Sequence, residues 1–183
     1  NEENLTPEEK LLKEIAIKKT TIEKIITLNI LEIKDLETKI EAVKEDEAEL
    51  ALVRDSFLKS LGAYSRYLSL MQERLPSARD LETVALIAGE LKNWRDSRYD
   101  SEVKRIVDFL LVYQNKNLLK IADHRFAKIA AEFKKFRLIK IKTEAWQPFL
   151  NQSALHLKAA RQLNLMAAEQ ILVFLPKAAQ TDL

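Results

Sequence analysis

The side chains that could do chemistry include two histidines, His124 and His156, and no cysteine. A transition-metal site on helices needs donors at spacings such as Glu-x-x-His or His-x-x-x-His, which bring them to one face. Ile121 stands three residues before His124 and Ser153 three residues before His156, so neither spacing occurs. Without cysteine there is no thiolate ligand, disulfide or cysteine nucleophile. We therefore expect no metal and no other cofactor.

Phosphate-binding loops and nucleophile elbows need clustered glycines, because their backbones turn sharply or approach the ligand closely. The chain has two glycines, Gly62 and Gly89, and both are isolated inside helical patterns. Acidic pairs are abundant, but on charged helices they usually solvate the surface. We expect a protein that is not an enzyme and has no catalytic residue.

A basic run supplies one candidate ligand site. Five cations fall within nine residues with no acid among them: Lys134, Lys135, Arg137, Lys140 and Lys142. Such a stripe could bind nucleic-acid phosphates or anionic lipid. It could also pair with acidic residues of the same chain, and we favour this second interpretation.

A second candidate, the Tyr/Trp/Arg cluster, is a possible surface for a protein partner. It consists of Tyr64, Arg66, Tyr67, Trp94, Arg95, Arg98 and Tyr99. These residue types dominate binding hot spots because they offer large amphipathic area at modest entropic cost. They could equally fill a junction between helices, and the sequence leaves both interpretations open.

The composition indicates which elements must position these residues. The chain is 47% hydrophobic and 32% charged, but its 183 residues include only two glycines and four prolines. Sheets and long loops need more turn residues than this. We predict an all-α fold and a single elongated domain over residues 1–183. Its expected helices cover about 7–75, 77–92, 101–142 with a candidate split at 115–117, and 148–175.

The first helix has a clear start, because Thr6 and Glu9 form a capping box around Pro7. Apolar residues then recur every three or four positions from 22 to 75, with Glu47 as a defect and Gly62 as a candidate bend. This seam predicts one very long N-terminal helix over residues 7–75, roughly 100 Å long at about 1.5 Å per residue.

Leu75 and Pro76 end that helix, and Ser77, with Asp80 three residues later, is the expected cap of the next. Residues 93–100 are polar and are expected to be irregular. The segment 77–142 is long enough to return antiparallel to helix 7–75, and 148–175 then turns back again. The result would be an antiparallel coiled-coil rod, two to three helices thick.

Charge is unevenly distributed along the chain. Residues 1–50 carry a net charge of −6, and the remaining residues carry +8. In the expected rod the acidic first helix lies beside the basic segment 104–142, where opposite charges can pair.

These features favour a structural or scaffold protein that acts through contacts with other proteins in a larger assembly, self-association included. A membrane-surface module similar to BAR domains is the first alternative, and a nucleic-acid-binding coiled coil is the second. No apolar stretch approaches the roughly 20 residues of a membrane span. The chain begins with Asn1 rather than Met, as a mature product after signal removal or a shortened chain would.

The chain has a processed-looking Asn1 start, no cysteine, an Ile/Lys/Glu-rich seam from Ile22 to Val43 and an expected bent helical rod. In these features it resembles the helical sheath proteins that coat the periplasmic flagella of spirochaetes. The resemblance is one of overall character. It implies an exported, periplasmic filament-coat component that affects filament curvature.

Overall fold

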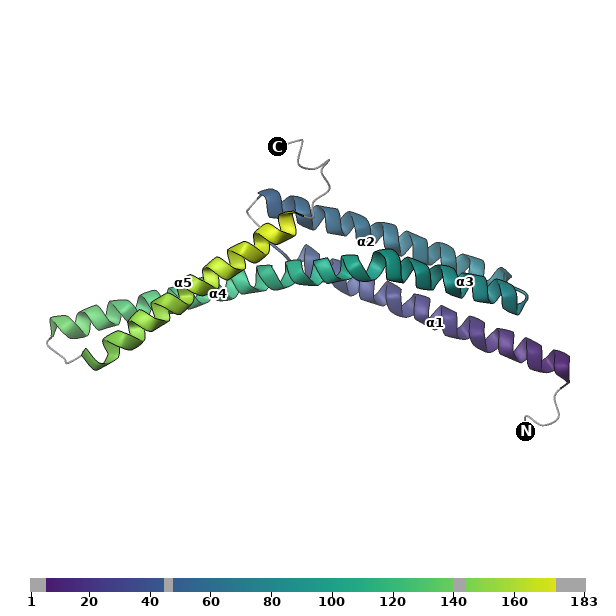
Figure 1. The fold of residues 1–183 in the computed structure, drawn as a ribbon, viewed down its shortest axis with the longest axis horizontal. Helices are drawn as coiled ribbons and strands as arrows, with labels where there is room; N and C mark the ends of the chain where they lie inside the picture. The colour runs from purple at the N-terminus through teal and green to yellow at the C-terminus, as the bar shows by residue number, and fades with distance from the viewer. Residues whose placement is uncertain (1–5, 45–47, 140–143, 174–183) are drawn as a thin grey trace. The chain divides into compact units, whose positions relative to one another are not determined.

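The computed structural model describes residues 6–44, 48–139 and 144–173, and these form helices without any strand. The predicted all-α class is confirmed (Figure 1). The elements are α1 (Pro7–Glu41), α2 (Ala48–Arg74), a 3₁₀ turn (Leu75–Ser77), α3 (Leu81–Trp94), a π-helical turn (Arg95–Tyr99), α4 (Asp100–Leu138), a second 3₁₀ turn (Glu144–Trp146) and α5 (Gln147–Leu172).

The chain divides into two compact units, Asn1–Ile106 and Val107–Leu183, with the boundary inside α4. The single domain over 1–183, the rod and the pairing of acidic with basic segments stay predictions.

In the first unit, α1 begins as the sequence predicts. The Thr6 hydroxyl accepts a hydrogen bond from the Glu9 amide at 3.3 Å, and the Glu9 carboxylate accepts one from the Thr6 amide at 2.8 Å. Buried residues then follow at spacings of three and four from Ile22 to Ile40. The seam therefore marks the side of α1 that packs inward.

The predicted uninterrupted helix over 7–75 is wrong. The first helix ends at Glu41, and α2 runs back along it in the opposite direction (Figure 1). Lys19, near the start of α1, donates hydrogen bonds from Nζ to the carbonyl oxygens of Pro76 and Ala78 at 2.9 and 3.0 Å. The two halves of the seam therefore pack against each other within one helical hairpin.

The break has a physical cause in the sequence. Residues 45–47 read Glu-Asp-Glu, and negative charge is unfavourable at a helix C-terminus, where the macrodipole is also negative. Arg54 of α2 donates to the carbonyl oxygen of Val43 at 3.4 Å, which satisfies a backbone acceptor beyond the end of α1.

Pro76 explains in part the turn that follows α2. The 3₁₀ turn contains Pro76, and the N-cap of α3 is Asp80, whose carboxylate accepts from the Thr83 amide at 2.6 Å. The expected cap at Ser77 is wrong, because its hydroxyl donates to the Arg74 carbonyl. The candidate bend at Gly62 lies inside α2, which continues to Arg74.

The polar segment 93–100 is not irregular, which corrects the prediction. Trp94 ends α3, Arg95–Tyr99 form the π-helical turn, and α4 follows directly. In the first unit α3 packs against α1 and runs in the same direction (Figure 1). It is joined to α2 by hydrogen bonds from Tyr67 and Arg74 to Glu90. Three helices therefore share the core of this unit.

The second unit is a helical hairpin of α4, from Val107 onward, and α5. The candidate split at 115–117 is absent, because α4 is continuous to Leu138. The helix α5 begins at Gln147, one residue before the predicted start at 148, so Pro148 is its second residue. Arg161 of α5 donates two hydrogen bonds to the Asp123 carboxylate of α4, one of them at 3.1 Å. The expected helix ends at 142 and 175 lie outside the described residues.

Candidate functional site

The structure brings the aromatic side chains of the Tyr/Trp/Arg cluster together at the junction of α2, α3 and the π-helical turn. Trp94 stacks on Tyr67 and on Tyr99, with ring centroids 4.8 and 5.0 Å apart and planes inclined by 28° in both pairs. Tyr64 meets Trp94 and Tyr99 edge to face at 5.6 and 5.8 Å. Such pairs add about 0.5–1.5 kcal/mol each beyond area burial.

The π-helical turn creates the stack of Trp94 on Tyr99. In a regular α-helix, residues five apart point about 140° away from each other. A π-helix instead bonds residues i and i+5, as the Asp100 amide does to the Arg95 carbonyl, and this brings such residues onto the same side. The extra residue therefore turns Tyr99 into the core beside Trp94.

Polar contacts join this turn to α1. The buried Tyr99 hydroxyl donates to the Glu32 carboxylate at 2.9 Å, and Arg95 donates to the Asn29 carboxamide oxygen at 3.2 Å. Burial, followed by the hydrogen bond to Glu32, raises the pKa of Tyr99. Arg95 also pairs with Asp100 at 3.1 Å. The cluster thus ties three helices of the unit together.

The cluster is divided between core and surface. Trp94 and Tyr99 are buried, and Tyr64 and Tyr67 are half-buried, which raises the pKa of both phenols. Its three arginines, Arg66, Arg95 and Arg98, are exposed. The aromatic residues therefore contribute to the packing of the junction, and the use of the cluster as a partner surface stays a prediction.

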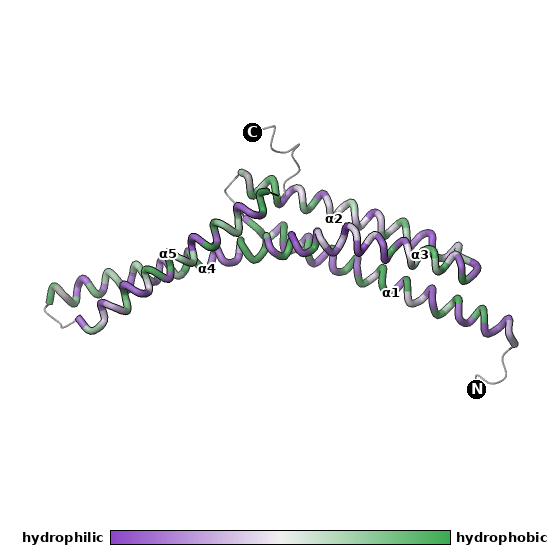
Figure 2. Tube along the Cα trace, in the orientation of Figure 1, coloured by the Kyte–Doolittle hydropathy of each residue, from purple (hydrophilic) through white to green (hydrophobic). Residues whose placement is uncertain are grey.

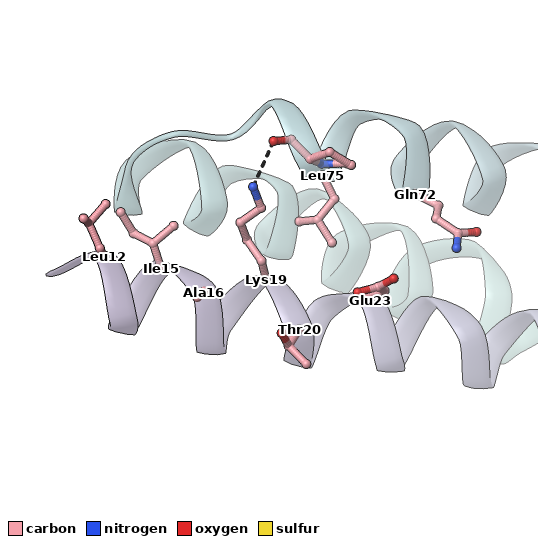
Figure 3. Close-up of a pocket in the computed structure, with 9 residues that line it drawn as sticks. Leu12, Ile15, Ala16, Lys19, Thr20, Glu23, Gln72 and Leu75 are labelled. Carbon is pink, nitrogen blue, oxygen red and sulfur yellow. Dashed lines mark hydrogen bonds between the residues drawn. The ribbon is translucent and has the colours of Figure 1, made fainter. Parts of the chain in front are cut away.

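A groove lies in the same unit between the start of α1 and the end of α2 (Figure 3). It has a volume of about 440 Å³, and its lining includes Leu12, Ile15, Glu23 and Leu75. Lys19 points across it toward the turn between α2 and α3, and its two hydrogen bonds to carbonyl oxygens there join this turn to α1. Among the described residues that line the groove, the two hydrogen bonds of Lys19 go to backbone carbonyl oxygens. The arrangement therefore favours a role in packing over a role in catalysis.

A second groove, of about 420 Å³, lies in the second unit between α4 and α5. It is lined by Asn115, Leu118, Leu119, Ala122, Ala160, Leu163, Asn164 and Ala167, none of which is charged. The Oδ1 atom of Asn164 is buried and has no hydrogen-bond donor within the described structure. Sequence reasoning missed this groove, although alanines beside large leucines on both segments were a usable signal.

The basic run is only partly described. Lys134 and Lys135 are exposed on α4, and Lys135 pairs with Glu132 at 2.6 Å. The Arg137 side chain and residues Lys140 and Lys142 lie outside the described residues. Its role as a ligand site stays a prediction.

The described residues contain no group of three His, Cys, Asp or Glu side chains placed to hold a metal ion. Within the same residues, no helix combines the length and the apolar character that crossing a membrane requires.

Comparison with protein-family models, with curated proteins and with solved structures found no match to this chain. The described surfaces that could support a function are the Tyr/Trp/Arg cluster, the two grooves and the exposed apolar side chains.

Proposed function

We propose that this chain is a non-enzymatic scaffold protein that joins a larger assembly through helix–helix contacts. The observation that supports the proposal is the burial pattern of the second unit. Among its described residues, the buried apolar side chains are Phe109, Val112 and Ile171, whereas fifteen large apolar side chains are exposed. Hydrophobic residues recur along both helices of this hairpin (Figure 2).

Two helices alone can cover only one stripe of each other. The inward side chains of the hairpin, such as Leu119, Phe126 and Leu157, are themselves only half-buried. Fully burying one further leucine or phenylalanine stabilises by about 1.5–3 kcal/mol. Contiguous groups of exposed apolar side chains on such a hairpin favour contact with another macromolecule.

A membrane-surface function similar to that of BAR domains is the second candidate, because Lys134 and Lys135 are exposed beside Phe136. Strong, salt-sensitive sedimentation with anionic liposomes would favour it, and no binding at low salt would remove it. A nucleic-acid-binding coiled coil ranks third, and a salt-dependent gel shift would test it. Both rank lower because the chain has a net charge of only +2 and its first 50 residues are acidic, whereas binding to anionic lipid or to phosphates depends on positive charge.

Within the scaffold proposal, the specific form we propose is an exported component of a filament or flagellar sheath. The support is the sequence resemblance together with the all-α architecture. A long helical surface can make repeated contacts, and heterologous contacts that do not close generate filaments.

The test is photo-crosslinking in the native cell, with a photoreactive residue at Ile129, which is exposed on α4. The control position is Lys92, a highly exposed residue of α3 in the first unit. We expect covalent adducts with protein chains from position 129 and few from position 92. The absence of protein adducts from position 129 would refute the scaffold function.

A further inference from the structure

We propose that the groove between α4 and α5 binds the same groove of a second copy of this chain, so that two hairpins form a four-helix bundle. The inference rests on the proposed scaffold function and names the partner. We call the surface concerned the groove face. Leu118 and Leu163 line the groove at its rim, and Ala122, Ala160 and Ala167 line its floor. Ile129, Phe136 and Phe149 do not line the groove, and they extend the rim along the two helices beyond it.

Helix geometry places these residues on one face. Residues seven apart in a helix lie two turns apart on the same side. Ala122, Ile129 and Phe136 form one such row, and Phe149 and Leu163, fourteen residues apart, belong to another. Ala122 and Leu163 line the same groove, so both rows start from it and continue along α4 and α5. His156, which is exposed, lies between Phe149 and Leu163 in the second row.

The face is complementary to itself. It combines large side chains at the rims with alanines at the floor, and close packing between helices alternates large and small residues in this way. When two copies face each other, the leucine rims of one can enter the alanine floor of the other. The lining of the groove itself carries no charge, so the two copies do not repel each other at the groove.

An unpaired polar atom also points to an occupant. The Asn164 Oδ1 atom is buried in the wall of the groove without a donor, which is costly unless another molecule supplies one. A second copy brings its own Asn115 and Asn164 carboxamides to the interface. An asparagine in an otherwise apolar helical interface commonly fixes its register.

The available area matches the need of a dimer. The five rim side chains are exposed by 40–66%, which leaves about 100 Å² on each and about 500 Å² of apolar area per copy. A standard interface buries about 800 Å² per partner, of which about 60% is apolar. The groove face alone therefore provides roughly the apolar area that one stable partner requires.

The experiment is sedimentation equilibrium of the full chain over a range of concentrations, with a matched pair of variants. Leu163 and Leu165 are exposed by 66% and 61% on the same helix, but they point about 160° apart. We expect the wild-type chain to dimerise, Leu163→Glu to raise the dimer Kd at least about 100-fold, and Leu165→Glu to leave it within about threefold. Circular dichroism checks that both variants keep their helices.

A third variant, Ala160→Leu, fills the floor without adding charge or lowering helix propensity. We expect it to raise the Kd at least about 10-fold, and it decides the question if Leu163→Glu loses helix content. A wild-type chain that stays monomeric at about 100 µM, or a dimer equally weakened by the Leu163 and Leu165 changes, would overturn the inference. In either case, protein adducts from position 129 with other chains would leave the scaffold function standing.

Discussion

Replacing Lys19 with methionine removes the side chain that joins the start of α1 to the turn after α2. The Lys19 ammonium donates to the carbonyls of Pro76 and Ala78 at 2.9 and 3.0 Å. In one straight helix over 7–75, positions 19 and 76 would be separated by about 86 Å, because each residue adds about 1.5 Å. The substitution therefore tests the hairpin directly.

The magnitude follows from these two hydrogen bonds. A hydrogen bond from a charged group contributes about 1.5–3 kcal/mol when it is well buried. The contact with Pro76 is exposed and the contact with Ala78 is part-buried, so solvent reduces both contributions. We expect Lys19→Met to lower the free energy of unfolding by about 1–3 kcal/mol.

The assay is urea unfolding followed by circular dichroism, with Lys18→Met as the control. Lys18 is exposed and pairs with Glu14 at 2.6 Å within α1, a type of contact that contributes about 0.3–0.5 kcal/mol. Equal effects of the two substitutions would contradict the hairpin and favour a first helix whose start and end do not meet.

Two further predictions concern the first unit. Ile26 is fully buried and Ile25 is 40% exposed. Ile26→Ala should therefore lower the free energy of unfolding by about 2–5 kcal/mol, and Ile25→Ala by less than about 1 kcal/mol. Similar losses for the two variants in urea unfolding would mean that the seam is misplaced. The Arg74 guanidinium, which hydrogen-bonds Glu90 at 2.6 Å, lowers the pKa of that carboxyl below 4.5. The pair therefore stabilises the fold at pH values above the pKa that Glu90 has in the unfolded chain. This stabilisation is lost as the pH falls through the lower pKa that Glu90 has in the folded chain. The difference in urea midpoint between the wild type and Glu90→Gln should accordingly shrink on acidification toward about pH 3, and a constant difference would contradict the pairing.

The sequence was sufficient for features that depend on neighbours along the chain. The capping box at Thr6 was predicted correctly, and the start of the last helix was predicted to within one residue, because capping and proline geometry act within one helical turn. The seam positions Ile26, Ile33 and Ile40 are buried as expected.

The partner of that seam could not be read from the same pattern. A spacing of three and four shows which side of a helix packs, but it is the same whether the helix continues or folds back on itself. The acidic sequence at 45–47 is unfavourable at the end of a helix, but only the contact of α2 with α1 shows that α2 runs back along α1. The π-helical turn at 95–99 was missed for a related reason, since one extra residue in a turn leaves no compositional signal.

The same division applies to the candidate sites. The sequence by itself determined an all-α chain and identified the aromatic residues Trp94 and Tyr99, because composition and residue type suffice for both. Only the tertiary structure decided that these two rings stack in the core, and that Leu118 and Leu163 border one groove. Both facts depend on how segments distant in sequence lie in space, and local propensity carries no information about that.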